Sequence, residues 1–278
     1  MGPDRDEEID STRRSWDRAT RQHNAHKGDQ AAAIKKNELL FPEEIALLGA
    51  IEGKEVVHLQ CNAGQDSLCL AKRKARVTGV DFSGEAVAFA RGLSRDSGIE
   101  ARFIEAEVVE WMRTTDERFD IAFASYGVIG WHPSVDAWMS GAARVLEPGG
   151  RLVYVEFHPL IWSLGQDAQL SGDDYFTKGP YIEPVGDYVA DSGTSLGAEK
   201  RAVVTPNDVP AYGYQHTLGE IASSAAKAGL RIERLEEYPH SNGYRPGPTF
   251  VAAEGRRWVW PVGRARIPLM FGLSAVKV

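Results

Sequence analysis

Two acidic residues follow short apolar segments, at positions where a nucleoside could be bound. Asp81 comes directly after the segment 75–80, and Glu107 follows the segment 101–104. A carboxylate about 20 residues beyond a first strand-to-helix turn can accept hydrogen bonds from both hydroxyls of a ribose. Glu107 could accept from an adenine amino group, with Val108 packed on the ring. The alternatives are a surface Asp81 that caps the next helix and a solvated Glu107.

The segment 60–64, Gln-Cys-Asn-Ala-Gly, precedes both acids and has the small residues that a ligand-binding turn needs. Small side chains let the backbone turn sharply and let a ligand approach it. The helix N-terminus beyond it offers unpaired N–H groups. A nicotinamide dinucleotide site requires G-x-G-x-x-G, but Gln60 and Asn62 occupy the first two glycine positions. Because a pyrophosphate would be crowded there, we expect a nucleoside without phosphate.

Three histidines are candidates for the general base of a transfer reaction: His132, His158 and His216. Such a base typically contributes about 10²–10⁴-fold to the rate. His158 ends an apolar segment next to Glu156, which could tune its imidazole. The alternatives are structural hydrogen bonds for His158 and His216 and a solvated loop position for His132. Their spacing contains no paired ligand motif, so we expect no metal.

Aromatic residues are frequent where we expect the acceptor to bind. They are Tyr126, Trp131, Trp162, Tyr175, Phe176, Tyr181 and Tyr188. An aromatic wall suits an apolar or aromatic small molecule with a few polar groups. The same rings could instead form the core of a long insertion.

The elements that must position these residues alternate between strand and helix patterns. Strands are predicted at residues 55–59, 75–80, 101–104, 119–124 and 151–157. Ser83 is expected to cap the helix after the second strand. The alternation indicates an α/β fold, with a parallel sheet and helices on both faces. Ligands bind such sheets at the carboxyl ends of the strands, where the candidate residues lie.

The segments flanking this pattern are expected to complete the site. Residues 1–15 are charged and poor in large apolar groups, which predicts a mobile tail. Residues 16–50 show helical patterns and could cover the cofactor. Residues 160–213 are rich in Gly, Asp, Tyr and Pro, with a short alternating stretch at 200–204. A segment this long is more often a lid or a binding insertion than a structureless loop.

Regular structure is expected to return after the insertion. Thr217 begins a capping-box pattern at a helix start. Residues 231–238 and 267–278 are predicted strands. Residues 16–278 would then form a single domain.

Composition restricts the class of partner and the compartment. The formal net charge is -7, and an acidic surface disfavours nucleic acid. The only two cysteines, Cys61 and Cys69, argue against a disulfide framework and favour a reducing compartment. The first residues contain no apolar stretch typical of a signal peptide, and no apolar run approaches the ~20 residues of a membrane span. We expect a cytoplasmic protein with no membrane or nucleic-acid partner.

The chain resembles the class I S-adenosylmethionine (SAM)-dependent methyltransferases. Their first motif reads roughly V-L-D-L-G-C-G-x-G, and residues 56–64 read V-V-H-L-Q-C-N-A-G. Asp81 in G-V-D-F-S matches the acid of the second motif, Glu107 the adenine-side acid, and residues 147–150 the E-P-G-G turn. The resemblance implies a Rossmann-like seven-stranded sheet with the last strand antiparallel, SAM as cofactor and S-adenosylhomocysteine (SAH) as product. The cofactor-binding residues it implies are His58, Gln60, Asn62, Gly64, Asp81, Phe82, Glu107, Val108 and Ser125.

More closely, the chain is similar to a bacterial subgroup with H-L-Q-C in the first motif. That subgroup has Y-G-V-x-x-W after the fourth strand and E-F-H-P after the fifth, matched by residues 126–131 and 156–159. It also shares Y-Q-H-T-L-G-E-I at 214–221 and an ending like P-L-M-F-G-L-S-A. In the subgroup His58 replaces the first-motif acid. What contacts the methionine amino group therefore stays open among His26, Ser125 and a backbone carbonyl.

Three functions remain to be compared. The first is methyl transfer from SAM to an oxygen or nitrogen of an apolar or aromatic metabolite. The residues expected to bind this acceptor are Tyr126, Trp131, Glu156, Trp162 and Tyr175. The second is a catalytically silent SAM-binding scaffold or sensor. The third, a nicotinamide-dependent oxidoreductase, is disfavoured by the missing glycines. In each case we expect a monomer or a homodimer.

Overall fold

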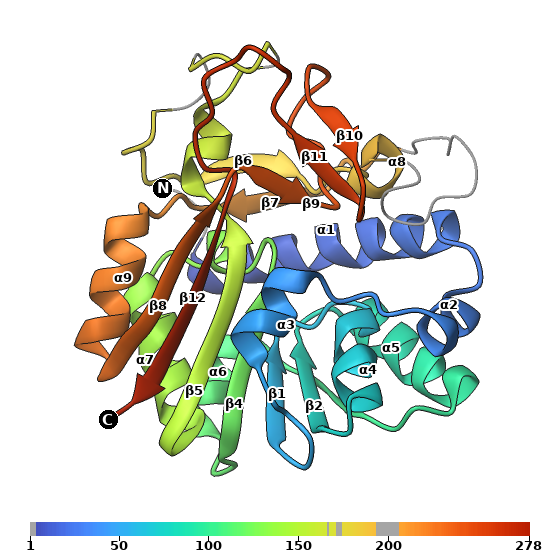
Figure 1. The fold of residues 1–278 in the computed structure, drawn as a ribbon. Helices are drawn as coiled ribbons and strands as arrows, with labels where there is room; N and C mark the ends of the chain where they lie inside the picture. Colours follow the sequence, from blue (N-terminus) through green and yellow to red (C-terminus); the bar gives the residue numbers. More distant parts are fainter. Residues whose placement is uncertain (1–3, 166, 171–173, 193–205) are drawn as a thin grey trace.

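A central sheet of seven strands runs through the protein (Figure 1). Its strands are β1 (Glu55–Leu59), β2 (Arg76–Asp81), β3 (Arg102–Glu105), β4 (Phe119–Ser125), β5 (Leu146–Phe157), β8 (Leu230–Tyr238) and β12 (Met270–Lys277). Their spatial order is β3-β2-β1-β4-β5-β12-β8. The first five pair in parallel, and β12 is antiparallel to both neighbours. The predicted Rossmann-like sheet with an antiparallel last strand is confirmed.

The computed structural model describes residues 4–165, 167–170, 174–192 and 206–278. Its helices next to the sheet are α2 (Gln30–Lys36), α3 (Pro42–Leu48), α4 (Gln65–Lys72), α5 (Gly84–Ser97), α6 (Val108–Thr114), α7 (Val135–Val145) and α9 (Leu218–Lys227). Ser83 caps α5, and Thr217 with Glu220 forms the capping box of α9, both as predicted. No helix in the described ranges is both long and apolar enough to cross a membrane.

The core lies on both faces of the sheet. Val57 and Leu59 of β1 pack in a buried cluster with residues of α6, α7 and α9. Val56, one residue away, faces a second cluster with residues of α2, α3, α4 and α5. Because successive side chains of a strand point to opposite faces, a parallel sheet covered on both sides has strands that are apolar throughout.

Helix α1 (Arg5–His26) contradicts the expected mobile tail at residues 1–15. Asp4 caps the helix by accepting a hydrogen bond from the Glu7 N–H (3.0 Å). Its inward side chains are small and polar: Ser15 accepts from the Val185 N–H (3.0 Å) and Thr12 from the Tyr212 N–H (3.0 Å). The helix is thus held by hydrogen bonds to distant backbone, which the low apolar content of this stretch does not reveal.

Two insertions form a layer on the far side of α1 from the sheet (Figure 1). The first contains β6 (Tyr181–Pro184), α8 (Tyr188–Ser192) and β7 (Pro210–Gly213), within the range expected for an insertion. The alternating stretch noted at 200–204 lies outside the described residues. The second insertion was not predicted. Its strands β9 (His240–Asn242), β10 (Val251–Ala253) and β11 (Arg257–Val259) form a small antiparallel sheet.

Candidate functional site

A cavity of about 870 Å³ lies at the carboxyl ends of the central parallel strands. The ends of β1, β2 and β4 contribute His58, Asp81 and Ser125 to its wall, and α1 contributes Trp16 and Thr20. Residues of both insertions complete the lining. The cavity therefore occupies the edge of the sheet at which ligands bind in open α/β folds.

The turn after β1 keeps a glycine-like backbone although glycines are missing from it. Gln60 has φ 55° and Asn62 has φ 46°, both in the left-handed region. The Gln60 carboxamide donates to the Val128 carbonyl (3.0 Å) and accepts from the Trp138 indole (3.0 Å). The Asn62 carboxamide oxygen accepts from the Ala63 N–H (2.6 Å). These hydrogen bonds hold the two side chains in place and stabilise the tight turn without glycine. The left-handed backbone costs about 1–2 kcal/mol per residue.

Gly64 positions the helix after this turn and does not line the cavity. Its φ is 78°, and a Cβ atom there would lie 2.7 Å from the Ala90 Cβ and 2.9 Å from the Phe103 ring. The expected cofactor contact of Gly64 is therefore corrected. This glycine lets α4 pack against α5 and β3.

Asp81 lines the cavity and is almost completely buried. Its carboxylate oxygens accept hydrogen bonds from the Asn62 N–H (2.8 Å) and the Ser83 N–H (2.9 Å), and the Phe82 backbone also contributes. Each carboxylate oxygen can accept two bonds, so acceptor capacity is left for a ligand. Burial raises the pKa of Asp81 to about 6. Asp81 is not the cap of α5. Ser83 caps this helix, because its hydroxyl accepts from the Ala86 N–H (3.1 Å).

A smaller pocket next to Asp81 contains the residues expected on the adenine side. Phe82, Glu107 and Val108 line it, and Ile9 of α1 closes it. Glu107 is the N-cap of α6, because its carboxylate accepts from the Glu110 N–H (2.6 Å). Its second oxygen lies 3.6 Å from Nδ1 of His132.

His58 and Ser125 reach the cavity, as expected. His58 lies 2.8 Å from the Ser67 hydroxyl through Nδ1, and burial lowers its pKa to about 3, so its imidazole is neutral. The Ser125 hydroxyl donates to the Asp66 carboxylate (3.4 Å).

Lys27 and Asp66 line the cavity and were missed in the sequence. Burial lowers the pKa of Lys27 to about 8, an effect opposed by the charge of Asp66. Among the described residues, the Lys27 ammonium forms no ion pair with a carboxylate. Lys27 follows a highly charged helix, so no sequence pattern distinguishes it from solvated neighbours.

Two buried polar atoms of α1 at the cavity have no hydrogen-bond partner. They are the Thr20 hydroxyl and the indole nitrogen of Trp16. An unsatisfied buried donor costs about 1–3 kcal/mol, so each favours a polar ligand in this space.

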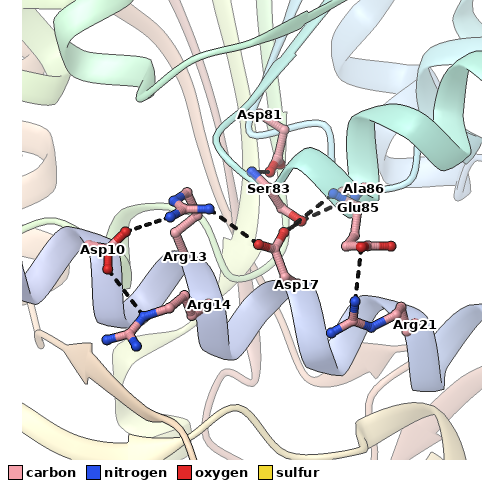
Figure 2. A network of polar contacts seen from close by, with 9 residues as sticks. All are labelled: Asp10, Arg13, Arg14, Asp17, Arg21, Asp81, Ser83, Glu85 and Ala86. Carbon is pink, nitrogen blue, oxygen red and sulfur yellow. Dashed lines mark hydrogen bonds and ion pairs between the residues drawn. The ribbon is translucent and has the colours of Figure 1, made fainter.

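Helix α1 is fastened beside Asp81 by the polar network in Figure 2. Asp17 accepts from the Ser83 hydroxyl (2.6 Å) and the Glu85 N–H (3.3 Å). Arg21 pairs with the Glu85 carboxylate (2.9 Å). The helix thereby closes one side of the cavity.

Backbone strain concentrates at the cavity. In the described ranges, six residues other than glycine have positive φ, and four of them line it: Gln60, Asn62, Tyr126 and Arg256. Such conformations persist where the surrounding structure imposes them, and they cluster at ligand sites.

The expected acceptor residues divide into two groups. Tyr126, Trp131 and Trp162 line the cavity. Tyr175 does not, because its hydroxyl accepts from the Leu218 N–H (3.1 Å) at the start of α9. Glu156 is also turned away from the cavity. It accepts from the Gly127 and Val128 N–H groups (2.6 and 2.8 Å) and from the Tyr154 hydroxyl (2.9 Å), and so holds the loop after β4.

The three candidate bases do not line the large cavity. His158 lies 3.0 Å from the Glu237 carboxylate and accepts from the Leu160 N–H (3.2 Å). His216 contacts the carbonyl oxygen of His132 through Nε2 (2.7 Å). His132 itself lines the small pocket, where burial lowers its pKa to about 3. Their contacts correspond to the structural alternative for His158 and His216, whereas His132 is buried rather than solvated.

Comparison with known proteins finds relatives for the middle of the chain. Residues 56–150 match the methyltransferase domain family. The ubiquinone/menaquinone biosynthesis C-methyltransferase UbiE of Bdellovibrio bacteriovorus is 29% identical over 138 residues, 48% of this chain and 57% of that protein. The demethylmenaquinone methyltransferase of Thermus thermophilus is 34% identical over 108 residues, 38% of this chain and 48% of that protein. The chain thus spans about half the length of the curated relatives it matches.

Comparison of folds also finds a methyltransferase structure. A crystal structure of a SAM-dependent methyltransferase from Mesorhizobium loti aligns with a TM-score of 0.57 and 20% identity. The alignment covers 88% of this chain and 100% of that one. Residues 56–150 are thus similar to the methyltransferase domain family, and the chain shares the fold of this SAM-dependent methyltransferase.

Proposed function

We propose that this protein transfers the methyl group of SAM to an oxygen or nitrogen of a small molecule with an apolar or aromatic body, and releases SAH. One observation carries the proposal. A single cavity joins the turn at residues 60–62 and Asp81 to the aromatic side chains of Tyr126, Trp131 and Trp162. Cofactor and acceptor must share one space for direct transfer, and this cavity provides it. Membership of the subgroup with the H-L-Q-C motif is part of the proposal.

The residues present fit the adenosine part of SAM. The free acceptor capacity of Asp81 suits the ribose hydroxyls. Phe82 and Val108 form an apolar slot for the adenine, and Glu107 can accept from its amino group. The unpartnered Thr20 hydroxyl offers a further polar contact from α1.

The residues present also fit the methionine part, which carries one ammonium and one carboxylate group. We assign the ammonium to Asp66 and the carboxylate to Lys27, because these opposite charges line the same cavity. Gln65 donates to the Gln30 side chain (2.6 Å), which ties the start of α4 to the start of α2, just beyond Lys27. The ammonium contact that was open among His26, Ser125 and a carbonyl group is thus given to Asp66, which Ser125 orients.

Methyl transfer requires little from protein side chains beyond placing the acceptor against the methyl group. Bound SAM supplies a methyl group on a sulfonium, which is already electrophilic. The aromatic wall then orients the acceptor in line and excludes water. Because the three candidate histidines do not line the cavity, we propose that positioning drives the transfer without a histidine base.

Calorimetry and a transfer assay test the proposal together. Titration with SAM and SAH should give saturable binding, whereas NAD should give none. Incubation with methyl-labelled SAM and fractionated metabolites should then label one small molecule. Binding of SAM without transfer to any fraction would favour the silent scaffold or sensor. Binding of NAD alone would exclude the proposed function.

A further inference from the structure

Arg256 lines the same cavity from a part of the chain outside the matched methyltransferase domain. It lies in the turn between β10 and β11, within the small sheet inserted before the last strand. Substrate selectivity is usually carried by such segments placed on a common scaffold. This arginine is therefore a candidate for recognition of the acceptor.

Two adjacent arginines differ in their partners. Arg257 is ion-paired with the Glu43 carboxylate, and its Nε lies 3.3 Å from the Asn242 carboxamide oxygen. The guanidinium of Arg256 lies 4.2 Å above the ring centre of Phe41 and donates to the Leu39 carbonyl. Within the described ranges it forms no ion pair with a carboxylate. A guanidinium has five N–H donors in a fork that fits a carboxylate, and most of these remain available here.

Two buried acids, Glu44 and Asp66, interact electrostatically with Arg256 but form no ion pair with it. Burial raises the pKa of Glu44 well above its usual range, which holds this carboxyl toward its neutral form. Burial also raises the pKa of Asp66, although Arg256 and Lys27 both act to lower it. Asp66 is thus shared electrostatically between Arg256 and Lys27 and is not an exclusive partner of either.

The backbone of Arg256 supports a functional role. Its φ is 61°, directly after Gly255 with φ 73°. The left-handed conformation costs a side chain other than glycine about 1–2 kcal/mol. A glycine at residue 256 would avoid this cost, so the guanidinium is held at the cavity against a local preference.

A continuous chain of rings begins at Phe41, beneath the guanidinium. Phe41 lies 6.0 Å from Tyr126, and Tyr126 lies 5.3 Å from Phe157, between ring centres. Phe157 is 5.1 Å from Tyr244 and 6.4 Å from Trp162. All five residues line the cavity. This wall suits an aromatic or aliphatic body whose charged end reaches Arg256.

We propose that the methyl acceptor is an aromatic or otherwise apolar acid, whose anionic group is bound by Arg256 while its body packs on this aromatic wall. The inference rests on the proposed function and adds the class of substrate.

Matched pairs of acids and amides test this inference by binding alone. The probes are naphthalene-2-carboxylate with naphthalene-2-carboxamide, and indole-3-acetate with indole-3-acetamide. They are titrated into the protein with and without saturating SAH, and ligand-observed NMR gives the affinities. We expect each acid to bind about ten- to a hundredfold more tightly than its amide. R256Q should abolish this preference, and R256K should keep part of it. The control R264Q, which removes an exposed arginine outside the cavity, should keep all of it.

Several outcomes would overturn the inference. They are equal binding of acid and amide to the wild-type protein, an acid preference that survives in R256Q, and no binding of either acid. A large loss of SAH affinity in R256Q would assign Arg256 to the cofactor instead. Melting curves of each variant show whether it folds. If SAH fails to bind the wild-type protein, the proposed function fails, while the acid preference is still read from the titrations without SAH.

Discussion

Buried charges determine how individual residues of this site act near neutral pH. Burial is the largest cause of the pKa shifts of Asp81, Asp66 and Lys27, and it moves each group toward its neutral form. Burial of an ionised group without a partner is costly. A ligand that carries hydroxyl donors, an ammonium and a carboxylate would supply the partners that these side chains lack.

D81N should change the dependence of stability on pH. The pKa of Asp81 is about 6 in the folded protein, above its model value of 3.8. Between these values the folded state binds more protons than the unfolded state, so the contribution of Asp81 to the free energy of unfolding falls as pH rises. D81N removes this contribution. Its stability relative to wild type should therefore increase from pH 4 to pH 6.5, by at most about 3 kcal/mol. Urea unfolding at several pH values measures this, with exposed Asp96 changed to Asn as control. Parallel pH curves for D81N and wild type would contradict the prediction.

K27M should weaken the binding of SAH and leave that of methylthioadenosine, which lacks the amino acid part, unchanged. Loss of a charge-assisted contact predicts a decrease of about tenfold or more for SAH alone. Wild-type affinity for SAH should also fall as pH rises through about 8, where Lys27 loses its proton. Asp66 favours the protonated form, while neighbouring His23 has a pKa of about 4 and is neutral in this range. Calorimetry with K36M, an exposed lysine on α2, provides the control. An equal loss for both ligands would remove Lys27 from the methionine site.

At the scale of elements, α1 and the two insertions enclose a site that the central sheet alone would leave open. α1 is held by Asp17 and Arg21 against the start of α5, and by Thr12 and Ser15 against the first insertion. We infer that α1 and the described elements of the first insertion, β6, α8 and β7, cover the bound cofactor. The cofactor must then enter through movement of one of these segments.

D17A should weaken the attachment of α1 to α5 and so make the covering of the cavity by α1 less stable. Asp17 joins α1 to α5, so its loss should speed amide exchange in α1 and the dissociation of SAH. The matched control is D10A, because Asp10 forms ion pairs with Arg13 and Arg14 of its own helix. Hydrogen exchange by mass spectrometry compares the two variants. Addition of SAM should also slow exchange in residues 16–36 of the wild-type protein. Unchanged exchange there would refute the covering role of this segment.

G64A should destabilise the contact between α4 and α5 more than a comparable change elsewhere. The new methyl group would meet Ala90 and Phe103 at less than 3.0 Å. Gly98 is the matched control, because it also has positive φ (66°) but nothing within 4 Å of an added Cβ. G64A should therefore lose about 1–3 kcal/mol more than G98A, the usual cost of overpacking. Urea unfolding of both variants measures the difference, and equal losses would show that the backbone conformation alone matters.

At the scale of the whole molecule, local patterns predicted the sheet and the caps of two flanking helices, but not the start of α1 or the second insertion. The strands follow from short apolar runs, and the caps at Ser83 and Thr217 from their side-chain chemistry. Residues 5–15 of α1 were missed because the buried positions in this stretch are Thr12 and Ser15. Strands β9 to β11 have three residues each, too few for a periodic pattern, and β10 is exposed throughout.

The residues of the candidate site divide in the same way, into those that local patterns place and those that only the folded structure places. The place of Asp81 at the cavity could be predicted because it follows from a single strand and turn. The contact of His158 could not, because its partner, Glu237, comes from β8, on the far side of β12 from β5. Lys27 and Arg256 reach the cavity from opposite ends of the chain, so only the folded structure brings them together.

A crystal structure of the protein grown with SAH tests the central claim most directly. The account predicts adenosine between the turn at residues 60–62 and the Asp81 carboxylate, with the amino acid part between Asp66 and Lys27. Density for SAH anywhere else, or a saturated crystal with no ligand in this cavity, would contradict it.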